Sequence, residues 1–301
     1  MLNLTNYYDI WLSYTLYYHI MRKLILILTV FFIFGESQTY AQKPLMPQPS
    51  TAQTVTQEFA LGQIQLSYSR PSVKGRKIFG GLLPYGEVWR TGANSATAIT
   101  FSDEVKIEGQ TVPAGTYALF TIPGEKEWTV ILNKNIKQWG AYSYKPEENF
   151  LQVKVKPVKL QSKIETFTIE FADVLPSSCT LAIKWENVSV PVSVTTDIDG
   201  RVMANIAEAM KGDKKPYLQA AQYYYQNNKD LNKALEWANE AEKADQKAPW
   251  VKYWKARIQL KMGDKQGAAT TAAAGVKAAE AINNAEYIRL NKGLLADAGK
   301  K

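Results

Sequence analysis

Residues 68–94 carry the side chains best suited to bind a ligand, in the run YSRPSVKGRKIFGGLLPYGEVWRTGAN. Five basic residues stand there against one acidic residue, a net charge of +4, whereas residues 42–196 as a whole carry only +3. Arginine offers a planar fork of N–H donors to a carboxylate, sulfate or phosphate group. The five glycines of the run allow backbone N–H groups to come close to an anion. This combination predicts an anion-binding loop.

Six side chains make up the predicted site, and the residues alone leave two roles open for them. As a ligand site, the basic groups would hold an anionic small molecule or glycan, the tryptophan would stack on a sugar ring, and the asparagine would orient a hydroxyl. As a structural loop, the arginines would pair with the acid and with backbone carbonyls, and the glycines would serve turns with positive φ. The six residues are Arg70, Lys74, Glu87, Trp89, Arg90 and Asn94.

The chain has one histidine, His19, and one cysteine, Cys179. His19 lies in a leader that we expect to be removed, which excludes His-based triads, imidazole bases and nearly all zinc sites from the mature chain. Because no histidine remains to activate it, Cys179 is expected to be a strand-edge residue and not a nucleophile. The sequence indicates no cofactor and no metal.

Residues 21–41 have the pattern of a secretory signal peptide. Arg22 and Lys23 precede an apolar run at 24–34, and Ala41 ends a cleavage site of small residues. The apolar run is short for a membrane span, so we expect cleavage after Ala41, a periplasmic or secreted protein, and no transmembrane anchor in the mature chain. Residues 1–20 are either an additional membrane-surface segment or precede the true start at Met21. The second alternative is favoured because signal peptides are normally N-terminal.

Composition divides the remaining chain into two parts. Residues 42–196 contain 14 valines and 10 alanines, whereas residues 197–301 contain 3 valines and 22 alanines. Valine favours strands and alanine favours helices. The sequence therefore predicts a leader at 1–41, a β-sandwich domain at 42–196 and a helical repeat module at 197–301.

Alternation with a period of two residues runs through the predicted β domain. Ile64, Leu66 and Tyr68 share one face of a strand, and residues 116–134 form a hairpin that turns at Pro123 and Gly124. No helical pattern interrupts the strands, which favours an all-β antiparallel sandwich or jelly roll. Further strands are predicted at 150–158, 165–174, 180–188 and 189–196.

The helical module repeats every 34 residues, which is the length of a tetratricopeptide unit. Residues 215–282 resemble that family in a degenerate form, with a capping helix expected at 284–297. Two such units are marginal alone, so packing against the β domain is expected. The matching pairs are Asp230 and Asp264, Ala234 and Ala268, Ala238 and Ala272, and Ala241 and Gly275.

Seven aromatic residues of this module lie at helical spacings. Filling the space between helices is the favoured role, and lining a groove for a peptide is the alternative. They are Tyr223, Tyr224, Tyr225, Trp237, Trp250, Tyr253 and Trp254.

The run at 68–94, followed by VPAGTYALFTIP and EWTVILNK, resembles the domain of unknown function family 2911 over residues 48–195. The resemblance implies an exported bacterial protein, some members of the family having a helical-repeat extension, and it implies no particular activity. The residues that match the family pattern are Arg70, Pro71, Gly75, Pro84, Gly86, Trp89, Arg90, Gly92 and Asn94.

These observations favour an exported cell-envelope protein that binds or scaffolds, with residues 68–94 as its ligand site and the helices as a contact surface for a protein partner. The alternative is an envelope hydrolase or lyase acting on an anionic glycan, with Glu87 as acid–base, Arg70 and Arg90 holding the substrate, and Tyr85 nearby. An enzyme of this sort usually needs a second ionisable group, and Tyr85 is the only near neighbour of suitable chemistry, so binding is favoured over catalysis. The net charge of +8 is compatible with nucleic-acid binding, but export and the lack of a nucleic-acid motif argue against it.

Overall fold

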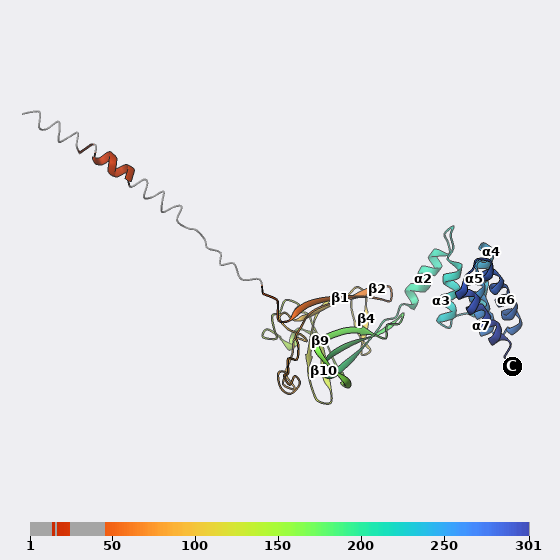
Figure 1. The fold of residues 1–301 in the computed structure, drawn as a ribbon, viewed down its shortest axis with the longest axis horizontal. Coiled ribbons are helices and arrows are strands. Elements are labelled where there is room, and N and C mark those ends of the chain that lie inside the picture. Colours follow the sequence, from red (N-terminus) through yellow and green to blue (C-terminus); the bar gives the residue numbers. More distant parts are fainter. Residues whose placement is uncertain (1–13, 16, 25–45, 301) are drawn as a thin grey trace, which may run out of the picture. The chain divides into compact units, whose positions relative to one another are not determined.

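A computed structural model describes residues 14–15, 17–24 and 46–300 of the chain. Ten strands within residues 51–195 form two antiparallel sheets, and six α-helices follow within residues 199–298 (Figure 1). The predicted order of an all-β part followed by an all-α part is confirmed. The apolar run and cleavage site expected at 24–41 lie, beyond residue 24, outside the described residues.

The larger sheet has six strands in the order β1-β2-β3-β6-β7-β8, and every neighbouring pair is antiparallel. The hairpin predicted at 116–134 is its β6–β7 pair, in which Ile122 lies opposite Thr129. The strands are β1 (Thr51–Phe59), β2 (Gly62–Arg70), β3 (Thr97–Phe101), β6 (Gly115–Ile122), β7 (Trp128–Asn133) and β8 (Asn149–Val155).

The smaller sheet has four strands in the order β5-β4-β10-β9. Its strands are β4 (Val105–Ile107), β5 (Gln110–Val112), β9 (Val158–Ala172) and β10 (Ser178–Thr195). The sequence predicted two strands where β10 is one continuous strand of 18 residues. Register shifts on both sides of Glu186, which has φ +53°, bend β10 without ending it.

The two sheets enclose one hydrophobic core. Ile64, Leu66 and Tyr68 all point into it from β2, as the alternation predicted. From the smaller sheet, Phe167 and Trp185 are fully buried against them. Burial of aromatic and branched side chains from both sheets is what stabilises a sandwich of this size.

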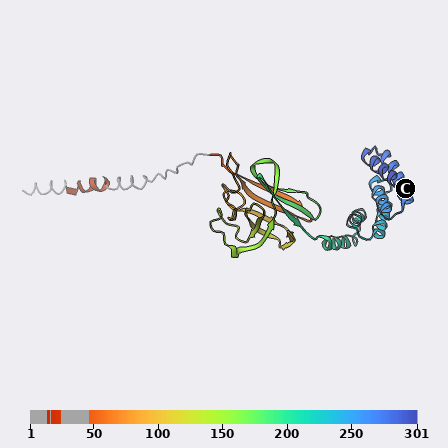
Figure 2. The ribbon, with the colours of Figure 1, turned by 90° about the horizontal axis from the view of Figure 1, so that it is seen from below.

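The helical part is a series of helices, and all but the first pack closely against a neighbour in sequence (Figure 2). They are α2 (Asp199–Ala209), α3 (Tyr217–Gln226), α4 (Leu231–Ala244), α5 (Pro249–Lys261), α6 (Lys265–Ala281) and α7 (Ala285–Ala298). Within the described part of the chain, no helix is both long enough and apolar enough to cross a membrane.

The 34-residue offset is a structural repeat of the helices. Helix α4 begins at Leu231 and α6 begins at Lys265, and the preceding residues, Asp230 and Asp264, both cap their helices by accepting backbone N–H groups. The small residues of the repeat are buried on the inner faces of α4 and α6. Helix α7 occupies the predicted capping position.

Candidate functional site

Residues 71–96, between β2 and β3, form an ordered connection pinned at several points. Isolated bridges join Ser72 to Thr166 and Trp89 to Thr121. Two residues after Trp89, Thr91 has φ +54°, which is strained for a β-branched residue. The Thr91 hydroxyl lies 3.0 Å from that of Thr121, and its carbonyl accepts a 2.6 Å hydrogen bond from Thr97. This connection is therefore part of the rigid body of the β domain.

Trp89 is a core residue, and the predicted stacking on a sugar ring is wrong. Its side chain is 6 % exposed, and its indole N–H donates to the carbonyl of Gly92 at 2.9 Å. The ring packs against Trp128, Phe167 and Trp185. The buried ring therefore has no face open to a ligand. An antiparallel bridge to Thr121 holds the backbone of Trp89 beside β6.

Arg70 and Asn94 hold the connection to neighbouring strands. The Arg70 Nε donates to the carbonyl of Phe167 at 3.0 Å, and its Nη2 donates to the Thr168 hydroxyl at 2.8 Å. The Asn94 side-chain amide donates to the Ser69 hydroxyl at 3.2 Å and reaches the carbonyl of residue 50 at 3.4 Å. These side-chain hydrogen bonds join the connection to other parts of the β domain, as expected if residues 68–94 are a structural loop.

Lys74 and Glu87 are exposed, and they lie at different turns of the connection. The backbone N–H of Lys74, which has φ +48°, donates to the Glu165 carboxylate at 2.8 Å. Arg90 is half-buried, and its buried Nε has no hydrogen-bond partner among the described residues. Glu87 has no partner in residues 46–300, so the predicted pairing of Glu87 with the arginines is wrong.

No hydrogen bond or ion pair joins any two of the six predicted site residues in the part of the chain that the structure describes. These six side chains therefore form no bonded cluster, and their convergence on an anion stays a prediction.

Cys179 is the second residue of β10, at the start of that strand. It is 4 % exposed within the sandwich core, and burial raises the pKa of its thiol to about 11. Among the described residues, no group of three or more His, Cys, Asp or Glu side chains could hold a metal ion.

A different arrangement stands out on the helical part, where five aromatic rings from alternate helices form a continuous row. Successive ring centroids are 5.8, 5.8, 6.0 and 6.1 Å apart. We call this row the aromatic face, and in order its members are Tyr225 of α3, Trp254 and Tyr253 of α5, Tyr287 of α7, and Trp250 of α5. All five keep exposed surface, and Trp250 is 37 % exposed.

The guanidinium of Arg257 lies against this face. Its central carbon is 4.4 Å from the Trp254 ring centroid, 4.8 Å from that of Tyr225 and 5.5 Å from that of Tyr253. Among residues 46–300, Arg257 has no hydrogen-bond acceptor and no acidic partner within 4.0 Å. One turn further along α5, the Lys261 ammonium lies 4.6 Å from the Tyr225 ring.

Helical periodicity explains this arrangement. Trp250, Trp254, Arg257 and Lys261 are spaced by three or four residues, so they share one face of α5. Val251, Ala256 and Ile258 of the same helix are buried on other faces. Sequence reasoning noted the aromatic residues and missed Arg257, although its spacing from Trp250 and Trp254 was a readable signal.

Core filling, the favoured prediction for the helical aromatic residues, holds for only part of the set. Trp237 is 8 % exposed and packs against Tyr224 with ring centroids 4.7 Å apart. Tyr223 is half-buried and donates its hydroxyl to Asp199 at 2.8 Å. The members of the aromatic face remain partly open, as the groove alternative requires.

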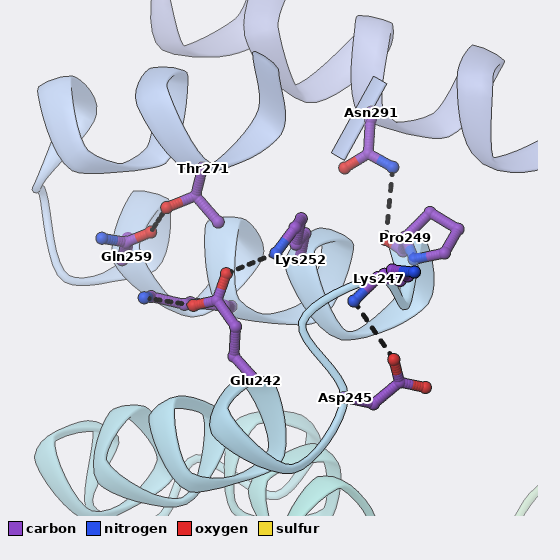
Figure 3. Close-up of polar contacts among 9 residues, drawn as sticks. Glu242, Asp245, Lys247, Pro249, Lys252, Gln259, Thr271 and Asn291 are labelled. Atoms are coloured by element: carbon purple, nitrogen blue, oxygen red, sulfur yellow. Dashed lines mark hydrogen bonds and ion pairs between the residues drawn. The ribbon is translucent and has the colours of Figure 1, made fainter. Parts of the chain in front are cut away.

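The helical part also has an open pocket of about 540 Å³ between α4 and α5. At its wall, Lys252 and Lys255 donate to the two oxygens of Glu242 at 2.6 and 2.7 Å (Figure 3). Burial alone would raise the pKa of Glu242, but these two hydrogen bonds hold it below its ordinary value. The lining residues are Glu236, Asn239, Glu240, Glu242, Lys243, Gln246, Lys252 and Lys255. Its three acids and three lysines balance, so this pocket offers no net charge to a ligand.

Further polar contacts join α5 to α6 and to α7. Gln259 accepts a hydrogen bond from the Thr271 hydroxyl at 2.8 Å, and Asn291 reaches the carbonyl of Pro249 at 3.4 Å (Figure 3). Asn291 is fully buried over Gly275, where a Cβ would lie 2.2 Å from the amide oxygen. The glycine of the repeat is therefore required by close packing between α6 and α7.

A family model described as "Protein of unknown function (DUF2911)" matches residues 50–194 of the chain. The match covers the β domain, confirms the resemblance seen in its motifs, and stops before α2. No curated protein and no solved structure matches the chain.

Proposed function

We propose that this protein is an exported binding or scaffolding protein of the cell envelope, whose helical module holds an acidic segment of a partner protein on the aromatic face. The observation that carries the proposal is Arg257, which lies over three aromatic rings and has no acidic partner among the described residues.

The chemistry of a guanidinium held against aromatic rings favours an acidic ligand. Three ring centroids lie within 5.5 Å of the central carbon of Arg257, and the N–H groups of a guanidinium lie in its own plane. Those donors fit the two oxygens of a carboxylate. Contact with several rings also limits the motion of the side chain, which lowers the entropy that binding must overcome.

The surrounding rings favour a chain segment over a small anion. The aromatic face extends from Tyr225 through Trp254 and Tyr253 to Trp250, well beyond the reach of Arg257. Partly exposed tyrosine, tryptophan and arginine are the residues that contribute most energy at protein interfaces. An acidic residue flanked by apolar residues would use both parts of this surface.

The β domain enters the proposal as a rigid body that carries the helical module. Its glycine-rich connection is used for internal hydrogen bonds and core packing, so a glycan site built from Arg70, Trp89 and Asn94 is not part of the proposal. The alternative of a hydrolase or lyase requires Glu87 beside Arg70 and Arg90, and no contact among these three supports it.

Site-specific photo-crosslinking in producing cells tests the proposal. A photoreactive phenylalanine replaces Tyr253 on the aromatic face or, as the matched control, Tyr85, which is 41 % exposed on the β domain. We expect a discrete adduct at position 253 that is absent at 85 and that mass spectrometry identifies as a protein with an acidic segment at the crosslink.

Arg257 variants in the crosslinking background decide whether the charge matters. Arg257→Gln should lower the adduct yield strongly, whereas Arg257→Lys, which keeps the charge over the rings, should lower it less. Equal yields from positions 253 and 85, or a yield unchanged by Arg257→Gln, would contradict the proposal.

A further inference from the structure

The connection between β7 and β8 exposes apolar side chains that the aromatic face does not involve. Residues 134–145 read KNIKQWGAYSYK. Ile136 is 41 % exposed, Trp139 is 66 % exposed and Tyr142 is 90 % exposed. Apolar groups of this size are costly to leave in water, so their concentration in one loop indicates a contact surface.

The same loop is strongly basic. Lys134, Lys137 and Lys145 are exposed, and the loop contains no acidic residue. None of the three lysines forms an ion pair within residues 46–300. The nearest acids in sequence, Glu147 and Glu148, lie in the short 3-10 turn that follows the loop. The loop thus carries unneutralised positive charge beside its exposed rings.

Hydrogen bonds and a β-bridge fix the backbone of this loop. The side-chain oxygen of Asn133 accepts hydrogen bonds from the N–H of Asn135 at 2.9 Å and from the Gln138 amide at 3.1 Å. Trp139 bridges to Ser95, and the N–H of residue 140 donates to the carbonyl of residue 94 at 3.0 Å. Because the backbone is already fixed, binding at the exposed side chains pays little further ordering entropy.

We infer that the loop 134–145 docks this protein on an anionic membrane surface. Trp139 and Tyr142 enter the headgroup region, where amphipathic aromatic rings partition, and Ile136 adds apolar contact. The lysines meet the lipid phosphates. A neutral glycan would account for the rings alone, whereas an anionic bilayer accounts for the rings, the isoleucine and the lysines together.

Co-sedimentation with lipid vesicles tests this inference. The chain from Gln42 onward is suitable, because residues 50–301 form a compact unit separate from residues 1–49 and the apolar leader would itself bind lipid. We expect binding to vesicles of mixed phosphatidylcholine and phosphatidylglycerol, and little binding to phosphatidylcholine alone.

Two pairs of variants separate the parts of the surface. Lys137→Gln with Lys145→Gln should lower the partition coefficient by about fivefold for each lysine. Trp139→Ala with Tyr142→Ala should lower it by about tenfold or more through lost apolar burial. The matched controls are Lys156→Gln with Lys163→Gln, which remove the same charge elsewhere on the β domain, and Tyr85→Ala, which removes another exposed ring. Both controls should retain binding, and thermal unfolding should show that all variants fold.

Three results would overturn the inference. The first is an equal loss of binding in the lysine controls, which would mean attraction by net charge alone. The second is unchanged binding in the Trp139 and Tyr142 variant. The third is tighter binding to soluble polygalacturonate than to the mixed vesicles, which would identify the loop as a surface for an anionic glycan.

Discussion

The indole rings of Trp89 and Trp185 are stacked, with centroids 5.7 Å apart and an angle of 19° between their planes. Trp185 belongs to β10, whereas Trp89 comes from the glycine-rich connection. The pair therefore binds this long connection into the sandwich core. The contact explains why residues that look available for a ligand in the sequence are used for structure.

Replacement of Trp89 tests that structural role. Trp89→Ala removes a buried ring and the hydrogen bond to the Gly92 carbonyl, so we expect the free energy of unfolding to fall by about 3–5 kcal/mol. Chemical denaturation measures the change. The matched Trp139→Ala variant removes a ring that is 66 % exposed and should change stability by less than about 0.5 kcal/mol. A similar small effect of both substitutions would refute the core role.

The thiol of Cys179 should be unreactive in the folded protein. Burial raises its pKa to about 11, so at pH 8 only about one thiol in a thousand is ionised, and the core also blocks access. Titration with a disulfide reagent should show no rapid reaction until denaturant is added. The stability that comes from this raised pKa is complete below the unfolded value near 9 and is lost as the pH rises towards 11. Rapid modification of native protein would place Cys179 at the surface.

Glu242 should be needed for the stability of the helical module. Glu242→Gln leaves the ammonium of Lys252, whose side chain is 10 % exposed, without its counter-charge, and we expect a loss of about 2 kcal/mol. Adding Lys252→Met should recover part of the loss. Because the folded-state pKa of Glu242 is lowered, its contribution is present above the ordinary value and is lost as the pH falls through the folded value. Circular dichroism during thermal unfolding at pH 7 and pH 3 checks both statements.

The two capping aspartates should contribute equivalently if the 34-residue repeat is structural. Asp230→Ala and Asp264→Ala each remove an acceptor for backbone N–H groups at a helix start, and each should cost about 1 kcal/mol. Urea unfolding followed by circular dichroism measures this cost. Asn replacements, which keep the cap, are the controls and should restore most of the stability. An effect at only one position would break the equivalence of the two helix pairs.

The proposed export makes a direct prediction about the N-terminus. Mass spectrometry of protein recovered from outside the cytoplasm should find a chain that begins at Gln42. Replacing Leu28 with Asp interrupts the apolar run, and the unprocessed chain should then stay inside the cell. Recovery of intact leader on exported protein would show that the cleavage site is wrong.

Local patterns in the sequence determined the class and order of the elements. Alternation placed Ile64, Leu66 and Tyr68 on one buried face, and the 34-residue spacing placed Asp230 and Asp264 at equivalent helix starts. The alternation and each helix cap depend on neighbours within a few residues, and the repeat is a fixed spacing along the chain, so the sequence alone reveals them.

Only the tertiary structure decided which side chains are available to a ligand. Trp89 and Arg70 look like binding residues until contacts with Trp185 and Phe167, about a hundred positions away, occupy them. The spacing of Arg257 places it on the same helix face as Trp254, but only the fold brings Tyr225 of another helix to within 4.8 Å of its guanidinium. Burial and hydrogen-bond partners are set by residues that are distant along the chain, and a pattern read along one strand or helix does not contain them.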